Sequence, residues 1–334
     1  MSQKSFRSQS GMAGRFAFAS LLVLMGTAMM AQMSPPAFPA GTVRPHGGRG
    51  GFGFERARLP FGIKAERNIP YVKNGGPNQV LDIFPPETPS AKPLPLMIWV
   101  NGGAWLGGDQ HDPPVLFLVT NGFAVASIQY RFSSQVKWPG QAYDVKAAIR
   151  FLRANAARYN FDPGHFGIGG DSAGGHLAAF AGTSGDVKSM EGDLGNPGYS
   201  TKVQAVVDWF GPTDLTQMEK EAKPGSWIQH NSPDAPEALL LGGPVQQMKE
   251  LAATANPITY ITSNEPPFLI MHGDNDLLVP WGQSDILAKA LIDAGNEVTM
   301  KTIHGAGHED RRFHSPANQR LMLDFLTLHL KTEP

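Results

Sequence analysis

The segment GDSAGG, which begins at Gly170, has the residue types and spacing of a nucleophile on a sharp turn. The run at 165–170 before Ser172 predicts a strand, and the alanine-rich stretch at 173–181 after it predicts a helix. A G-x-S-x-G motif at such a turn exposes the serine oxygen at the end of the sheet, and the helix aims free N–H groups and positive dipole toward it. Ser172 is therefore our candidate nucleophile. The alternative is a glycine-rich turn in which the serine only caps the helix.

Two later segments supply candidates for the base and the acid. A serine hydroxyl is a poor nucleophile at neutral pH, and it is activated by a histidine whose tautomer a carboxylate fixes. The segment HGDND offers Asp274 or Asp276 as the acid, and the segment HGAGH offers His304 or His308 as the base. Each segment follows a predicted strand, so these side chains would reach the same rim of a parallel sheet. Spacing alone does not choose within either pair.

The segment NGGAW, which begins at Asn101, supplies hydrogen-bond donors for the reaction intermediate. It follows the apolar run at 94–100, and its glycines permit a close backbone approach. The carbonyl oxygen of an ester becomes negative in the tetrahedral intermediate, so N–H groups must already point at its position. We predict that these oxyanion-hole donors are the N–H groups of Gly103, Ala104 and Ala173.

An alternation of strands and helices must position these segments. Strands are predicted at 79–85, 94–100, 123–130, 165–170, 203–210, 267–273 and 297–303. Helices are predicted at 141–158, 173–181, 280–295 and 318–330. This alternation predicts an α/β protein with a mostly parallel central sheet and helices on both faces. In the helix at 141–158, apolar residues recur at helical spacing, and Lys146, Arg150 and Arg153 fill the opposite face.

The first 31 residues have the pattern of a signal peptide. Lys4, Arg7 and Arg15 precede a stretch without charge at 16–30, which is shorter than the roughly 20 apolar residues of a membrane span. We therefore expect cleavage near Ala31, no stable membrane insertion afterwards, and a periplasmic or secreted protein. The alternative is an N-terminal membrane anchor.

We predict three parts for the chain: a signal peptide at 1–31, a linker arm at 32–64 and an α/β domain at 65–334. The arm is basic and rich in proline and glycine, a composition that favours a solvated tether. Residues 211–262 have no clear strand pattern, and we predict that they form an insertion of loops and short helices between two strands.

Composition excludes several classes of function. The 334 residues include 28 Lys and Arg against 29 Asp and Glu, a formal net charge of −1, so we expect no nucleic-acid partner. The chain has no cysteine, which excludes thiol catalysis and cysteine metal sites. No cluster has metal-ligand spacing, and we predict neither a metal nor a cofactor. We expect His176, Asp144 and Asp208 to serve packing or local pairing.

As a set, these motifs resemble those of the α/β-hydrolase esterases of the hormone-sensitive-lipase-like and bacterial feruloyl-esterase-like branch, a carbohydrate esterase-like family. The matching segments are NGGAW (101–105), YRFS (130–133), WPGQAYD (138–144), GDSAGGHLA (170–178), GPTDL (211–215), LLGGP (240–244), HGDNDLLVP (272–280) and HGAGH (304–308). The resemblance covers about residues 65–330 and implies the α/β-hydrolase fold. It also implies that Ser172 is the nucleophile, His308 the base and Asp276 the acid.

The resemblance further implies a serine carboxylic-ester hydrolase that forms an acyl-enzyme, and the signal-peptide pattern predicts that it is exported. Its expected substrates are small-molecule or carbohydrate esters with short-chain or aromatic acyl groups, and Trp105 and Trp227 are candidates for the substrate pocket. Asn101 departs from the family pattern, because relatives usually have histidine there, but the backbone donors are kept. The alternatives are an arylformamidase-like amide hydrolase, which shares the Gly-Gly-x-Trp loop, and a non-catalytic binding module on the same fold.

Overall fold

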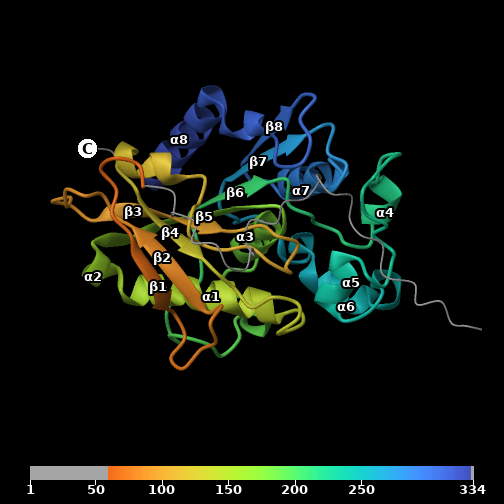
Figure 1. Ribbon diagram of the computed structural model, residues 1–334, viewed down its shortest axis with the longest axis horizontal. Coiled ribbons are helices and arrows are strands. Elements are labelled where there is room, and N and C mark those ends of the chain that lie inside the picture. The colour runs from red at the N-terminus through yellow and green to blue at the C-terminus, as the bar shows by residue number, and fades with distance from the viewer. Residues whose placement is uncertain (1–58, 332–334) are drawn as a thin grey trace, which may run out of the picture. The chain divides into compact units, whose positions relative to one another are not determined.

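The computed structural model describes residues 59–331, and a sheet of eight strands runs through them (Figure 1). The strands are β1 (Glu66–Pro70), β2 (Val80–Phe84), β3 (Leu94–Val100), β4 (Ala124–Ile128), β5 (Phe161–Asp171), β6 (Ala205–Trp209), β7 (Phe268–Gly273) and β8 (Val298–Ile303). Their order in the sheet is β1-β2-β4-β3-β5-β6-β7-β8. Strands β3 to β8 pair in parallel, whereas β1 and β2 pair antiparallel at one edge. The predicted signal peptide, at 1–31, lies outside the described residues.

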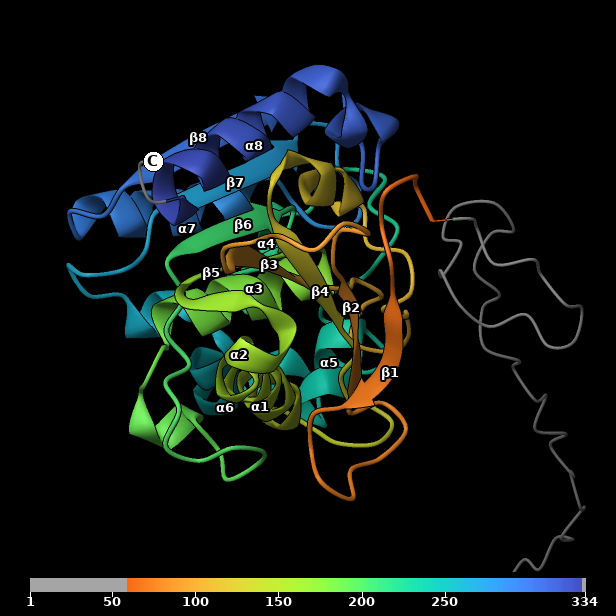
Figure 2. The same ribbon diagram turned by 90° about the vertical axis from the view of Figure 1, so that its left-hand side faces the viewer.

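Helices cover both faces of the sheet (Figure 2). The helices are α1 (Gly140–Ala154), α2 (Ala156–Tyr159), α3 (Ala173–Thr183), α4 (Met218–Glu221), α5 (Pro236–Leu241), α6 (Lys249–Ala255), α7 (Gly282–Asp293) and α8 (Pro316–Leu330), with a 3-10 helix η1 at Leu116–Asn121. One apolar cluster includes Val145 of α1, Leu177 of α3 and Leu291 of α7. A second cluster, on the other face, includes Leu118 of η1 and Leu326 of α8. The predicted α/β architecture with a mostly parallel sheet is confirmed.

The seven predicted strands are all present, and their ends differ from the predicted ends by a few residues. The sequence analysis missed β1, the antiparallel edge strand. It is short, its residues are exposed or half-buried, and its pairing with β2 is interrupted between Glu66 and Ile69. An edge strand with one solvated face and an irregular register has little apolar pattern to detect.

The packed domain and the stretch between β6 and β7 differ in how closely they follow the predicted parts. The packed domain begins before residue 65, because Ile63 is buried and forms a bridge with Pro86. The stretch at 211–262 holds α4, α5, α6 and two 3-10 helices at Val245–Gln247 and Pro257–Tyr260. Within residues 59–331, no helix is both long enough and apolar enough to cross a membrane.

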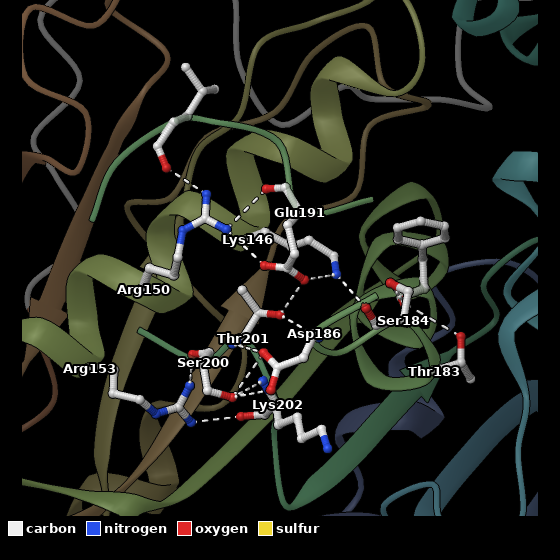
Figure 3. Close-up of polar contacts among 12 residues, drawn as sticks. Lys146, Arg150, Arg153, Thr183, Ser184, Asp186, Glu191, Ser200, Thr201 and Lys202 are labelled. Atoms are coloured by element: carbon white, nitrogen blue, oxygen red, sulfur yellow. Dashed lines mark hydrogen bonds and ion pairs between the residues drawn. The ribbon is translucent and has the colours of Figure 1, made fainter. Parts of the chain in front are cut away.

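The predicted polar face of α1 is covered rather than solvated. Lys146 is fully buried and Arg150 is 3% exposed, because the segment 184–204 lies over this face (Figure 3). The Lys146 ammonium donates to the carbonyl oxygen of Ser184 at 2.5 Å and to Glu191 Oε1 at 2.7 Å. The Arg150 guanidinium donates to Glu191 Oε2 at 2.8 Å. Burial lowers the pKa of Lys146, although its contacts with Glu191 oppose the shift.

We expect Glu191→Ala to lower the free energy of unfolding by about 2–3 kcal/mol, because it leaves the Lys146 charge buried without its partner. The Glu191 side chain is 21% exposed, which keeps the expected loss below that of a fully buried pair. Urea denaturation measures this free energy. The control Asp324→Ala removes an ion pair with Arg320 on α8 whose side chains are largely exposed, and it should cost less than about 0.5 kcal/mol. Equal losses in the two variants would contradict a stabilising role for the buried cluster.

Candidate active site

Ser172 occupies the turn between β5 and α3 in a conformation that requires small neighbours. Its φ is 53°, in the left-handed region, and its N–H donates to the carbonyl oxygen of Trp209 at 2.9 Å. A Cβ on Gly174 would lie 2.0 Å from the carbonyl oxygen of Val100, and a Cβ on Gly170 would lie 2.4 Å from the backbone of Gly174. The helix can therefore pack this closely against the strands only because both positions are glycine.

The loops that follow β7 and β8 bring Asp276 and His308 to this turn. His308 Nε2 lies 3.0 Å from Ser172 Oγ, and His308 Nδ1 lies 2.7 Å from Asp276 Oδ2. The three side chains form one hydrogen-bonded line. In such a line a histidine can take a proton from the serine while the carboxylate holds the ring.

Asp276 is buried, and its carboxylate is surrounded by donors. The N–H groups of Leu278 and Val279 donate to its Oδ1 at 2.8 and 2.9 Å, and His272 Nε2 lies 3.3 Å from its Oδ2. Burial alone would raise the pKa of Asp276. The charge of His308 and the hydrogen bonds from His272 and His308 outweigh burial, so the pKa lies well below its usual range. Asp276 is therefore ionised at neutral pH and can accept from His308.

Asp274 and His304 form a separate pair at the surface. Asp274 Oδ2 lies 2.7 Å from His304 Nδ1, and the N–H of Gly305 donates to Asp274 Oδ1 at 2.6 Å. The His304 side chain is 86% exposed. Of the two aspartates and two histidines that spacing leaves open, the structure places Asp276 and His308 beside the serine, while the other pair closes the loop after β8.

His308 lies among carboxylates and against an aromatic ring. Its ring centroid is 4.6 Å from that of Phe210. Burial alone would lower the pKa of His308, but the charges of Asp276, Glu309 and Asp171 and the hydrogen bond that His308 donates to Asp276 outweigh it, so the pKa is raised above its ordinary value of 6.5. These carboxylates favour the imidazolium form, which is the form that a base reaches after it takes a proton.

The loop after β3 begins beside the serine turn, because Val100 is the register partner of Gly170. Gly103 has a φ of 112° and Ala104 has a φ of 55°, so both backbones are in the left-handed half of conformational space. Among residues 59–331, the N–H groups of Gly103, Ala104 and Ala173 donate to no protein acceptor. Unpaired N–H groups next to a serine are the donors that a tetrahedral intermediate requires.

Asn101 packs inside this loop. Its Nδ2 donates to the carbonyl oxygen of Gly102 at 3.0 Å, and the Tyr130 hydroxyl donates to the Asn101 carbonyl oxygen at 3.2 Å. A Cβ on Gly108 would lie 2.3 Å from Asn101 Nδ2. Asn101, the residue that departs from the family pattern, therefore packs against the backbone of the loop and makes no hydrogen bond with the N–H donors of Gly103 and Ala104.

The two tryptophans named as pocket candidates occupy different environments. Trp105 is 2% exposed, and its ring packs edge-on against His176 at a centroid distance of 5.4 Å, so it lies in the core behind the loop. Trp227 is 44% exposed, and its backbone N–H donates to the carbonyl oxygen of Leu277 at 3.0 Å. Leu277 directly follows Asp276, so the Trp227 backbone is held against the loop that carries the candidate acid.

The sequence analysis missed His272 and Asp171 as parts of this site. His272 is fixed from its other side, because its Nδ1 lies 2.7 Å from Ser284 Oγ. Asp171 occupies the variable position before the serine of the motif, and its Oδ1 accepts from Trp99 Nε1 at 3.1 Å. In the sequence, both residues lie close to candidate catalytic residues. Closeness in the chain does not show whether a side chain contacts the catalytic group or only precedes it.

Residues predicted to be structural have protein partners. His176 Nε2 lies 2.8 Å from the carbonyl oxygen of Ala255, and Asp144 accepts from the Arg131 guanidinium at 2.8 Å. In the part of the chain that the structure describes, no group of three histidine, aspartate or glutamate side chains could hold a metal ion.

A mostly parallel sheet with a serine on the turn after β5 defines the α/β-hydrolase class of fold. Within that class the chain belongs to the BD-FAE family, which it matches over residues 81–291. The resemblance drawn from the motifs is therefore confirmed.

Several esterases are similar to this chain. Esterase LipQ of Mycobacterium tuberculosis is 35% identical over 236 residues, which are 68% of this chain and 53% of LipQ. Esterase LipC of the same organism is 31% identical over 242 residues, which are 70% of this chain and 57% of LipC. The chain thus spans about half the length of these curated relatives. A truncated form of a carbohydrate esterase from gut microbiota has a solved structure with a TM-score of 0.75 and 34% identity, covering 80% of this chain and 97% of that one.

Proposed function

We propose that the protein is a carboxylic ester hydrolase in which Ser172 is the nucleophile, His308 the general base and Asp276 the acid that orients it. The observation that carries this proposal is the hydrogen-bonded line from Asp276 through His308 to Ser172, with distances of 2.7 and 3.0 Å. The esterase relatives, at 31–35% identity, support the choice of an ester as substrate.

In the proposed reaction, Ser172 Oγ attacks the carbonyl carbon while His308 Nε2 takes the hydroxyl proton. The N–H groups of Gly103, Ala104 and Ala173 stabilise the oxyanion that forms. The intermediate collapses, His308 returns the proton to the leaving alcohol, and an acyl-enzyme remains. Water then attacks the acyl-enzyme with His308 as base, and the carboxylic acid leaves.

Labelling with a fluorophosphonate tests the proposed nucleophile. We expect a covalent adduct on Ser172, located by peptide mass spectrometry, together with loss of p-nitrophenyl acetate hydrolysis. The variant His308→Ala should label far more slowly, because it lacks the base that activates the serine. No adduct and no hydrolysis above buffer would overturn the proposal in favour of a binding module. Faster turnover of an aryl formamide than of the acetate ester would favour the amide hydrolase.

We propose further that the substrates are short-chain or aromatic acyl esters of carbohydrates. The likeness to a carbohydrate esterase at 34% identity supports this class. The half-exposed indole of Trp227 supports it independently, because a flat aromatic face beside the loop that carries Asp276 can stack on a sugar ring.

Trp227→Ala should therefore lower kcat/KM for an acetylated xylooligosaccharide by about 3- to 10-fold, the loss expected for one aromatic contact. Hydrolysis of p-nitrophenyl acetate should change by less than about twofold, since that ester has no sugar to stack. Tyr199→Ala is the matched control. Tyr199 is 47% exposed. It comes before β6, whereas Ser172 comes after the parallel strand β5, so the two residues lie toward opposite ends of these strands. Equal losses on the two substrates would contradict a sugar contact at Trp227.

The proposed base predicts the acidic limb of the pH profile. His308 must be neutral to take a proton, and its pKa is raised above 6.5, so kcat/KM should fall as the pH drops through a midpoint above 6.5. Glu309 contributes to that increase, so Glu309→Gln should move the midpoint to lower pH. The control Asp293→Asn, on exposed α7 surface, should leave it in place. A flat profile from pH 4 to 8 would exclude His308 as the base.

We also propose that the protein is exported, on the pattern of charged and apolar residues at 1–31. N-terminal sequencing of protein from the periplasm or medium should find a chain that begins near residue 32. Full-length protein in the membrane fraction would favour the anchored alternative.

A further inference from the structure

Asp171 connects the serine turn to the loop after β3. It is the last residue of β5 and directly precedes Ser172. Its Oδ1 accepts from Trp99 Nε1 on β3 at 3.1 Å. Its Oδ2 lies 2.4 Å from the position that a Cβ on Gly102 would take, so the carboxylate is pressed against the Gly102 backbone. One carboxylate thus touches β3, the loop after it and the strand that carries the serine.

The loop after β3 and the serine turn, which this carboxylate joins, carry different donors of the proposed oxyanion hole. Gly103 and Ala104 directly follow Gly102, whereas Ala173 lies two residues after Asp171. The distance between the two sets of donors depends on how the loop is held against the turn. Asn101 supports the loop from below, but its side-chain hydrogen bond stays within the loop and does not reach the turn.

We propose that Asp171 is a positioning residue whose carboxylate sets the spacing between Ser172 and the N–H donors of Gly103 and Ala104. The inference rests on the proposed function, since it assigns a role within the same site. A displacement of about 1 Å in a catalytic arrangement can cost about 100-fold in rate, so a single side chain that fixes this spacing has a large effect.

The surroundings of Asp171 agree with this role. Burial and the charge of Glu309 raise the pKa of Asp171 to about 6, while the hydrogen bonds from Trp99 and the Gly102 N–H and the charge of His308 oppose the shift. Tyr130 is also a titratable neighbour, and burial and the Asp171 charge both raise the pKa of its hydroxyl. The hydrogen bonds with Trp99 and Gly102 both favour the ionised form of the carboxylate.

Asp171→Asn tests the proposal, because an amide offers only one acceptor. Whichever way the amide is turned, its NH₂ group faces either Trp99 Nε1–H or the Gly102 N–H. We expect kcat for p-nitrophenyl acetate at pH 8 to fall by about 10- to 100-fold, with KM changed by less than about threefold. The Ki of a boronic acid, which forms a tetrahedral adduct with the serine, should rise by a similar factor.

Asp208→Asn is the matched control. Asp208 is a fully buried carboxyl on the neighbouring strand β6, and its Oδ1 accepts from the Gly211 N–H at 2.9 Å. Burial raises the pKa of Asp208 to about 7, although the Gly211 hydrogen bond opposes the shift, so a neutral amide is a close substitute. This variant should keep kcat and the boronate Ki within about threefold of wild type, because it does not touch the loop after β3.

Two results would overturn the proposal: wild-type kcat in Asp171→Asn, or a loss of kcat with an unchanged boronate Ki. If Asp171→Asn does not fold, Trp99→Phe decides, because it removes one donor to Asp171 and leaves the carboxylate in place. It should lower kcat and weaken the boronate together, by a smaller factor, and no change in either would also overturn the proposal. Failure of the proposed function is a distinct result, since it would appear as full hydrolysis by Ser172→Ala.

Discussion

Ser172→Ala is expected to lower kcat/KM for p-nitrophenyl acetate by about 10⁴-fold or more, the range found when the nucleophile of a catalytic triad is removed. The variant keeps the backbone of the turn but removes the Ser172 Oγ atom, which lies 3.0 Å from His308 Nε2. No acyl-enzyme can then form. The remaining rate should reflect substrate binding and oxyanion stabilisation alone.

The control for this result is Ser189→Ala, at an exposed position in the segment that covers α1. It should have the activity of the wild type. Thermal unfolding of both variants shows whether the fold is kept. Equal low rates in the wild type and Ser172→Ala would mean that Ser172 is not a nucleophile, and the binding-module hypothesis would then replace the esterase.

Asp276→Asn is expected to lower kcat by about 10³- to 10⁴-fold, because an amide at this position favours the wrong tautomer of the histidine and cannot stabilise its charged form. The contact that is lost is the 2.7 Å hydrogen bond to His308 Nδ1. Steady-state kinetics with p-nitrophenyl acetate measure the loss. KM should change far less than kcat, since Asp276 does not reach the substrate.

Asp274→Asn is a closely matched control, since Asp274 lies two residues away and also pairs with a histidine at 2.7 Å. Its partner His304 is exposed and does not contact Ser172. We therefore expect Asp274→Asn to keep kcat within about threefold of wild type. A large loss in Asp274→Asn with full activity in Asp276→Asn would reverse the proposed assignment of the acid.

Local patterns were enough to predict most elements of the fold. The uninterrupted apolar run at 94–100 predicts a strand buried on both faces, and β3 occupies those residues in the interior of the sheet. The small residues around Ser172 predict a strand-to-helix turn, and there a Cβ on Gly170 or Gly174 would collide with the backbone. Both predictions depend on interactions within a short stretch of chain. They do not depend on which particular residue packs against that stretch.

Other features depend on what covers a residue, which a local pattern does not contain. Lys146 has the position of a solvent-facing residue on an amphipathic helix, but a later segment buries it with Glu191 as its partner. Trp105 follows the Gly-Gly pair and was a pocket candidate, but the loop places its ring in the core. In both cases the covering residues come from distant parts of the chain.

The sequence by itself determined the fold class, the family and the short segments in which a nucleophile, an acid and a base could lie. Spacing left Asp274 and Asp276 open, and only the resemblance to a family favoured Asp276. The tertiary structure places Asp276 rather than Asp274 against His308, and it alone showed that Asp171 bridges two strands. The physical reason is the length scale of the contacts. Strand and turn patterns arise between residues close in the chain. These hydrogen bonds instead join residues that are 32 and 72 positions apart in the chain and that the strand order brings together.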